Sequence, residues 1–418
     1  SRHTGEYDGT VFPIDDTGPY GFHQSLRQFS EELQLQGKAF DKNLQYVVGF
    51  YYSSERDKSR STTYIFDFEP FIPTSLQINH GVTKNTTVAG YAQGTLDLSS
   101  LTGVKGLGFT AGVRYSSEKI TFAREPDDFF ITNPNPNFVT PQRDRFNKVS
   151  WQFGLQEQVN SDLLLYAVTR RSNRSGGFNF YAPPVPGFGN EGGGEYRPEI
   201  ATDVELGAKY RNNIGIPVRF NLAAYEMWID NIQRSNYVSI FGSLAGITVN
   251  VPKARIRGIE FDGSVQPARW LDIGGNLNYP DAKFTSNIVS VLDNPAVAFS
   301  TYPDTPKWSG LLYAEMSTHI SPDLKLSLRG EGYGQTSTYF VSTAKTLNPG
   351  AELPGYAIAN FRIGVEQERR GWSLNLNLKN AFNRVYYVGG IGFSSLLGVN
   401  TALPGDPRTV LVEMKFRF

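Results

Sequence analysis

The residues best suited to ligand chemistry form a basic cluster, Arg170, Arg171 and Arg174. Three guanidinium groups this close together could capture an anionic ligand, because a guanidinium binds carboxylates and phosphates through paired hydrogen bonds. They could equally pair with acidic side chains of the protein or with phosphates of lipid headgroups. The sequence therefore predicts Arg171 and Arg174 as candidate substrate-binding residues, at the start of a long connecting segment.

The other reactive residue types show no catalytic or metal-binding arrangement. The chain has no Cys, which removes thiolate ligands, cysteine nucleophiles and disulfides. The carboxylates of Glu125, Asp127 and Asp128 surround a proline and indicate a solvated loop tip. The four His residues lack the spacing of metal ligands: His3, His23, His80 and His319. We therefore expect no enzyme activity, no cofactor and no metal site built by the protein.

The composition favours one large repetitive β architecture. Aromatic residues make up 13% of the 418 residues, Gly contributes 42 residues, and charged residues make up only 19%. No run approaches the roughly 20 apolar residues of a membrane-spanning helix. The 40 basic residues balance the 40 acidic ones, so no net charge attracts nucleic acid.

Alternation of apolar and polar residues with period 2 recurs along the chain. At the C-terminal end, one face carries Val410, Val412, Met414, Phe416 and Phe418, and the polar residues between them occupy the other face. Because strand side chains point alternately to opposite faces, each such stretch is a strand with one apolar face. The pattern predicts about fifteen strands, at 26–36, 43–54, 86–98, 107–118, 145–158, 162–172, 201–211, 217–234, 246–266, 269–280, 307–318, 323–334, 356–367, 371–382 and 408–418.

The lengths of the connections between these strands predict a transmembrane antiparallel β-barrel. Short connections such as 160–161 and 267–268 alternate without a break with long ones such as 173–200 and 281–306. Short periplasmic turns and long extracellular loops are typical of outer-membrane barrels, and about ten tilted residues suffice to cross the bilayer. Counted back from the last strand, residues 1–25 are expected to be the remnant of an extracellular loop.

The strand count predicts that the barrel is incomplete. Fifteen is odd, whereas single-chain barrels of bacteria have an even number of strands. An unclosed edge in lipid leaves backbone N–H and C=O groups unpaired, at several kcal/mol each. We therefore expect either that residues 26–418 are the C-terminal portion of a longer barrel or that the count of fifteen strands is off by one.

The orientation of the strand 162–172 decides which arginine side chain faces the lumen. If Leu164, Tyr166 and Val168 face lipid, Arg171 faces the lumen, and Arg174 lies in the following loop. Tyrosines near strand ends are expected to form aromatic girdles at the membrane interfaces more often than ligand-stacking surfaces. Seven are candidates for such girdles: Tyr46, Tyr51, Tyr52, Tyr91, Tyr115, Tyr166 and Tyr210.

Several segments resemble, in order along the chain, conserved patterns of the TonB-dependent outer-membrane receptors. They are GVRY at 112–115, LLYAVTR at 164–170 continuing into RSGGFN at 174–179, RPE at 197–199 followed by ELGAK at 205–209, ARIRGIEF at 254–261, and NLNLKNAFNR at 375–384 followed by YY at 386–387. The resemblance spans roughly residues 26–418.

The resemblance implies a barrel of about 22 strands with a plugged lumen, located in the bacterial outer membrane and energised by TonB. It implies that a plug, a TonB box and about seven strands lie outside this chain. Ferric siderophores are the commonest substrates of the family, while cobalamin, haem, oligosaccharides and plant-derived aromatics stay open. The expected partners are outer-membrane lipid, TonB through the missing N-terminal region, a small-molecule ligand and the outer-membrane assembly machinery. Met414, Phe416 and Phe418 are expected to form the assembly signal.

Two alternatives stay open from the sequence. A passive porin or structural barrel would lack TonB coupling, and an upstream signal peptide running directly into strands would support it. An all-β extracellular enzyme or lectin would be soluble without detergent, whereas a barrel would fractionate with membranes.

Overall fold

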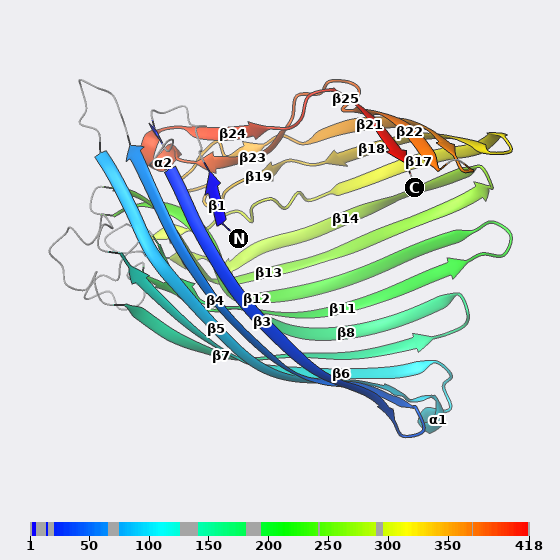
Figure 1. Ribbon diagram of the computed structural model, residues 1–418, viewed down its shortest axis with the longest axis horizontal. Coiled ribbons are helices and arrows are strands. Elements are labelled where there is room, and N and C mark those ends of the chain that lie inside the picture. Colours follow the sequence, from blue (N-terminus) through cyan, green and yellow to red (C-terminus); the bar gives the residue numbers. More distant parts are fainter. Residues whose placement is uncertain are drawn as a thin grey trace.

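A single curved antiparallel sheet forms the body of the molecule (Figure 1). The computed structural model describes residues 2–5, 14–15, 21–65, 75–125, 141–180, 194–240, 243–289, 296–369 and 371–416. All fifteen predicted strands are confirmed, as β3 Gly21–Ala39, β4 Leu44–Ile65, β5 Ser75–Asp97, β6 Leu107–Arg124, β7 Gln142–Gln158, β8 Leu163–Arg174, β11 Glu199–Asn212, β12 Val218–Ile240, β13 Ser243–Ala268, β14 Leu271–Ser286, β17 Ser309–Ser321, β18 Leu324–Gln335, β21 Tyr356–Gln367, β22 Trp372–Lys379 and β25 Thr409–Phe416.

Short elements accompany the long strands. β1 Arg2–Gly5 and β2 Ile14–Asp15 pair with β3 and β4. Two-stranded ribbons join the long strands at the extracellular side: β9 Gly177–Phe178 with β10 Glu195–Tyr196, β15 Ile288–Val289 with β16 Val297–Ala298, β19 Thr338–Tyr339 with β20 Glu352–Leu353, and β23 Tyr387–Gly392 with β24 Asn400–Pro404. The helices α1 Ser99–Thr102 and α2 Ser394–Leu397 have four residues each. Among the described residues, no helix is both long and apolar enough to cross a membrane.

Each long strand pairs with the next long strand along the chain, from β3 to β25. Within the described ranges, β25 pairs only with β22, and no pairing joins it to β3, whose outer edge pairs with the short β1 along Phe22–Ser25. The sheet is therefore open between β25 and β3 in this part of the chain. Short turns connect the strands at one end. The turn from β3 to β4 places Phe40, Asp41 and Lys42 at positive φ, and the amide of Asn43 closes it on the carbonyl of Phe40 at 3.0 Å.

The two faces of the sheet differ in polarity. Directly opposite residues on paired strands share a face. One face exposes large apolar side chains from β6, β7 and β11, such as Val113, Phe153 and Leu206. The opposite face carries charged side chains in ion pairs, such as Arg170 with Asp203. A barrel in lipid turns its apolar face outward and its polar face to the lumen, which identifies the lipid face and the lumen face here.

The strands extend further on the extracellular side than the apolar pattern predicts. β4 continues to Ile65, and β5 begins at Ser75. β12 and β13 pair up to Ile240 and Ser243, so the prediction of a long connection between the strands 217–234 and 246–266 is wrong. Period-2 polarity arises from lipid on one side of a strand. Where a hairpin rises above the bilayer, that signal is lost, while the backbone pairing continues.

A buried amide network holds the extracellular segment after β8 in place. The Gln233 Nε2 donates to the carbonyls of Ser175, at 2.7 Å, and Arg197, at 3.1 Å. Asn179 and the backbone of Thr248 exchange two hydrogen bonds, of 2.9 and 2.7 Å. The segment RSGGFN is therefore fixed to β12 and β13, which gives this part of the family resemblance a structural role.

The NAFNR part of the resemblance is also structural. Asn380 is buried, has a φ of 45°, and donates from Nδ2 to the carbonyls of Arg384 and Asp406 at 2.8 and 3.0 Å. Its Oδ1 accepts the amide of Arg384 at 2.9 Å. Asn suits this position because it tolerates the left-handed conformation and its amide satisfies backbone groups. The corner after β22 is thereby fixed.

The last strand exposes the apolar face that the sequence predicts. Val410, Val412, Met414 and Phe416 are each more than half exposed to the surroundings of the sheet. Phe418 lies outside the described residues.

Candidate functional site

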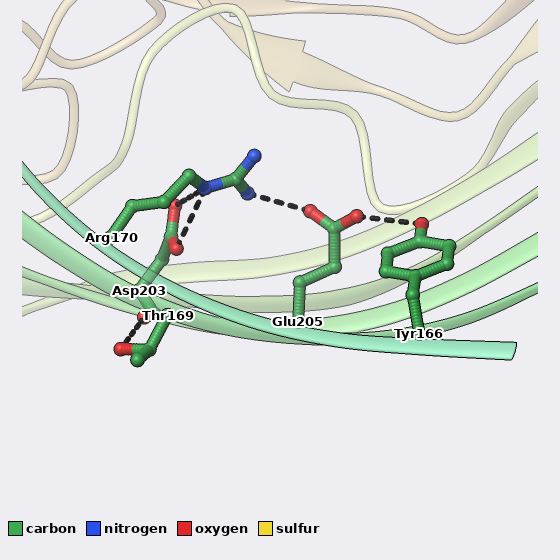
Figure 2. Close-up of polar contacts among 5 residues, drawn as sticks. All are labelled: Tyr166, Thr169, Arg170, Asp203 and Glu205. Atoms are coloured by element: carbon green, nitrogen blue, oxygen red, sulfur yellow. Dashed lines mark hydrogen bonds and ion pairs between the residues drawn. The ribbon is translucent and has the colours of Figure 1, made fainter. Parts of the chain in front are cut away.

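The lumen face carries a charged cluster at the pairing of β8 with β11 (Figure 2). Arg170 Nε donates to both carboxylate oxygens of Asp203, at 3.0 and 3.1 Å. Its Nη2 donates to Glu205 at 2.7 Å, and the Tyr166 hydroxyl donates to the other oxygen of Glu205 at 2.7 Å. One guanidinium thus bridges two carboxylates, and the second carboxylate is also held by a phenol.

The register of the two strands produces this cluster. Arg170 lies directly opposite Asp203, and Tyr166 lies opposite Gly207. Glu205 lies on the same face of β11, between Asp203 and Gly207, so its carboxylate reaches both Arg170 and Tyr166. Since Gly207 has no side chain, the Tyr166 ring lies across the β11 backbone there.

A second polar group continues along the same face towards β3. The Arg114 guanidinium lies 5.3 Å from the ring centroid of Tyr51 and 5.6 Å from that of Tyr91. The Tyr91 hydroxyl donates to Glu32 at 2.7 Å. A cation over aromatic faces is stabilised by the ring quadrupoles and stays available to a ligand.

Two surface depressions lie between these groups. One has a volume of about 340 Å³ and includes Tyr166, Glu205 and Lys209 in its lining. The other has a volume of about 350 Å³ and includes Tyr91 and Arg114. Gln152 and Arg170 line both, so the depressions are contiguous. Together they form what we call the lumenal belt, defined by Tyr91, Arg114, Gln152, Tyr166, Arg170 and Glu205.

A separate ionic network lies on β17, β18 and β21. Arg329 donates to Glu315 and to Glu331, each at 3.1 Å, and Arg362 donates to Glu315 at 3.4 Å. The side chains of Arg329, Glu315 and Glu331 are each between 26% and 29% exposed. Here two carboxylates balance the charge of two guanidinium groups, so we assign this network to the wall of the sheet and not to the capture of a ligand.

The predicted orientation of strand 162–172 is wrong. Tyr166 and Arg170 share the face of the β11 carboxylates, whereas Arg171 lies opposite Trp151 and Thr202 on the lipid face. Arg174, which was predicted to lie in the following loop, is instead the last residue of β8 and lies opposite Glu199 on the lumen face. The lumenal arginine of this strand is therefore Arg170, which the sequence placed in the basic cluster but not among the binding residues.

Three of the seven predicted girdle tyrosines face the lumen. Tyr51 and Tyr91 lie under Arg114, and Tyr166 binds Glu205. Tyr115, which is 52% exposed, lies on the lipid face as predicted for a girdle.

The arrangement suits binding of polar or anionic groups. Among the described residues, no group of three or more His, Cys, Asp or Glu side chains could hold a metal ion. The belt contains cations, aromatic faces, amides and hydroxyls, which recognise charged and planar ligands by hydrogen bonds and stacking.

Comparison with known protein families decides the identity of this fold. Residues 1–381 match the model of the TonB dependent receptor-like β-barrel. The chain belongs to the TonB-dependent receptor family. It is therefore an outer-membrane β-barrel protein, and the predicted family and location are confirmed.

Solved structures of the family share this fold at low sequence identity. The ferric yersiniabactin uptake receptor FyuA from Yersinia pestis has a TM-score of 0.75 and 16% identity, and the match covers 100% of this chain and 57% of FyuA. The siderophore receptor PiuA from Acinetobacter baumannii has a TM-score of 0.69 and 15% identity, covering 94% and 56%. The copper transporter OprC has a TM-score of 0.69 and 15% identity, covering 95% and 58%. The chain thus spans little more than half the length of these proteins.

One extracellular contact outside the belt gives a pH-dependent prediction. Burial and a hydrogen bond to Asp144 raise the pKa of Glu195 to about 7, while Arg197 acts in the opposite direction. A carboxyl with a raised folded-state pKa stabilises the fold while it is protonated in both states, and this stabilisation is lost as pH rises through the folded pKa. We expect the ribbon of β9 and β10 to open more often as pH rises from about 4.5 to above 7.

Hydrogen exchange of the backbone amides at 194–197, corrected for intrinsic rates, measures this opening. The Glu195→Gln variant keeps a hydrogen-bonding group without a titrating proton and is expected to lose the pH dependence. Equal pH dependence in both proteins would contradict the assignment to Glu195.

Proposed function

We propose that this chain is the C-terminal part of an outer-membrane receptor that binds a scarce nutrient and imports it with energy from TonB. The lumenal belt is the observation that carries the proposal. Its cations, Arg114 and Arg170, line contiguous depressions together with Tyr91 and Tyr166. A ferric siderophore or a similar chelate offers the anionic oxygens and planar groups that such side chains bind.

The functions of the similar structures support a metal chelate as the substrate. One is a ferric yersiniabactin uptake receptor, another is a siderophore receptor, and a third is a copper transporter. Their identity to this chain is 15–16%, so the substrate of this chain is our proposal. We further propose that residues 26–418 form the C-terminal portion of the barrel, that residues 1–25 belong to an extracellular loop, and that TonB acts through a region outside the chain.

Uptake by the full-length protein tests the function. A strain lacking its gene is expected to stop growing when one ferric siderophore is the sole iron source, and a strain lacking TonB is expected to show the same loss. Accumulation that continues without TonB would favour the passive porin. The Arg114→Gln variant is expected to bind the imported chelate at least tenfold more weakly, while Arg269→Gln, in the exposed turn between β13 and β14, keeps normal affinity.

We propose that Met414, Phe416 and Phe418 form the signal read by the outer-membrane assembly machinery. Support comes from the exposed apolar face that Met414 and Phe416 share on the last strand. Removing Phe418 is expected to reduce the amount of folded protein in the outer membrane several-fold. Semi-native electrophoresis, in which folded barrels migrate differently before and after heating, measures that amount. Unchanged folded yield would contradict the proposal.

A further inference from the structure

The lipid face carries a row of cations and one tryptophan that crosses five strands. The row lies near the extracellular ends of β8, β11 and β14, whereas β12 and β13 continue beyond it. The register places its members directly opposite one another, strand by strand: Arg171 on β8, Thr202 on β11, Trp228 on β12, Arg255 on β13 and Lys283 on β14. Trp151 on β7 continues the row next to Arg171. All of these residues lie on the face opposite to the lumenal belt.

The next row on the same face, towards the centre of the bilayer, adds one more cation and two carboxylates. Arg257 Nε binds Asp281 at 3.0 Å, and Lys283 Nζ lies 3.5 Å from the same oxygen. Arg255 Nε lies 3.7 Å from Glu226, beyond a good hydrogen bond. Four cations therefore face two carboxylates.

Arg171 is the clearest unsatisfied cation of the group. Its side chain is exposed and makes no hydrogen bond or ion pair within the described part of the chain. Neighbouring Arg255 is only 28% exposed, and its Nε has no hydrogen-bond partner there. We call Arg171, Arg255, Arg257 and Lys283 the outer basic patch; it carries an excess of two positive charges over Glu226 and Asp281.

The level of the patch on the barrel points to its partner. The row below Arg257 is apolar and includes Leu206 and Ile259, which are 58% and 51% exposed to lipid. Trp228, 44% exposed within the upper row, has the amphipathic ring that settles at the headgroup level. Cations on a lipid-facing surface are tolerated at the interface and costly at the bilayer centre. The patch thus lies where headgroup phosphates of the outer leaflet lie.

We propose that the outer basic patch binds the phosphate groups of an anionic glycolipid in the outer leaflet. Guanidinium groups pair with phosphate oxygens through two parallel hydrogen bonds. The upper row crosses four strand spacings, about 19 Å, which gives room for more than one phosphate. Trp228 lies between Arg171 and Arg255 in this row and offers an apolar surface to the headgroup. The site is separate from the lumen and does not depend on the proposed import function.

The test uses the full-length protein purified in detergent, with a bisphosphorylated lipid A as the probe and native mass spectrometry as the readout. The double variant Arg171→Gln/Arg255→Gln is expected to bind lipid A at least tenfold more weakly than the wild type. The control Lys105→Gln/Arg269→Gln removes two exposed cations from turns at the opposite ends of the strands and is expected to bind normally. Heat-modifiable migration confirms that each variant is folded.

Further outcomes separate the possible partners. Dephosphorylated lipid A is expected to lose most of the affinity, and inorganic phosphate at the same concentration is expected not to compete. Equal binding of the phosphorylated and dephosphorylated lipids overturns the proposal, as does equal loss in the control. Unchanged lipid binding together with loss of a co-purifying protein assigns the patch to a protein interface and also overturns it. If the double variant does not fold, Lys283→Gln alone, at the margin of the patch, is expected to show a smaller loss in the same direction.

Discussion

Replacing Gly207 with valine is expected to lower the free energy of unfolding of the barrel by about 3 kcal/mol. A Cβ at Gly207 would fall inside the ring of Tyr166, which lies across the β11 backbone at this point. The ring must move away, so the hydrogen bond from its hydroxyl to Glu205 is lost. Overpacking costs about 1–3 kcal/mol and a hydrogen bond to a charged group contributes about 1.5–3 kcal/mol.

The arrangement of a tyrosine over a glycine recurs across the sheet. In five directly opposite pairs on the described long strands, a Cβ added to the glycine would come within 3.0 Å of the tyrosine ring or hydroxyl: Gly37 with Tyr46, Gly49 with Tyr91, Gly207 with Tyr166, Gly258 with Tyr225, and Gly274 with Tyr313. Aromatic residues commonly pair across antiparallel strands, and glycine lets the ring lie flat on the neighbouring backbone. Part of the high Gly and Tyr content of this chain thus has a packing reason.

A matched control exists on β5. Gly90 lies directly opposite Tyr115, but a Cβ added to Gly90 would have no atom within 4 Å. Gly90→Val is therefore expected to change stability by less than about 0.5 kcal/mol. Urea unfolding in detergent, followed by tryptophan fluorescence, compares the two variants. Equal stabilities would show that the Tyr166 ring does not depend on the space over Gly207.

The strands could be predicted because lipid imposes a simple pattern on them. In β11, Val204 and Leu206 face lipid while Asp203 and Glu205 face the lumen, so the sequence alone gives both the strand and its faces. The long strands follow from such alternation where it is present, and otherwise from the lengths of their connections.

The orientation of β8 could not be read from its own residues. From Leu163 to Val168 every side chain is apolar or aromatic, so both faces have the same polarity and the period-2 signal disappears. The neighbouring strand decides the question, because its carboxylates bind Arg170 and Tyr166. Since the register between two strands is not visible in either strand alone, the assignment of Arg171 to the lumen was wrong.

The contacts that hold the extracellular segments could not be predicted from the sequence either. Asn179 binds Thr248, 69 residues away, and Gln233 binds Ser175, 58 residues away. Single amides of this kind carry no periodic signal. Their roles depend on the curvature of the sheet, which brings the segment after β8 against β12 and β13. The family resemblance identified RSGGFN as a conserved pattern, and the structure supplies its physical reason.

Removing the Arg170 side chain is expected to cost about 2 kcal/mol of stability and to disturb the lumenal belt. Asp203 and Glu205, whose side chains are only 13% and 21% exposed, would be left without their shared cation. Breaking a fully buried pair costs about 3–5 kcal/mol, and the 42% exposure of Arg170 reduces that figure here. Arg171→Ala, one residue further on, removes an outward-facing cation without a partner and is expected to change stability by less than about 0.5 kcal/mol.

A double-mutant cycle separates the ion pair from the packing of the arginine stem. Arg170→Ala and Asp203→Asn are each expected to destabilise the barrel, and the double variant is expected to be less destabilised than the sum of the two by about 1–2 kcal/mol. This coupling arises because the loss of one partner leaves the other as an uncompensated charge, and the second substitution removes that charge. Arg170→Lys keeps the charge but cannot bridge Asp203 and Glu205 with a planar fork, so it is expected to restore only part of the stability. Zero coupling in urea unfolding would mean that Arg170 acts through packing alone, and the belt would then lack its central ion pair.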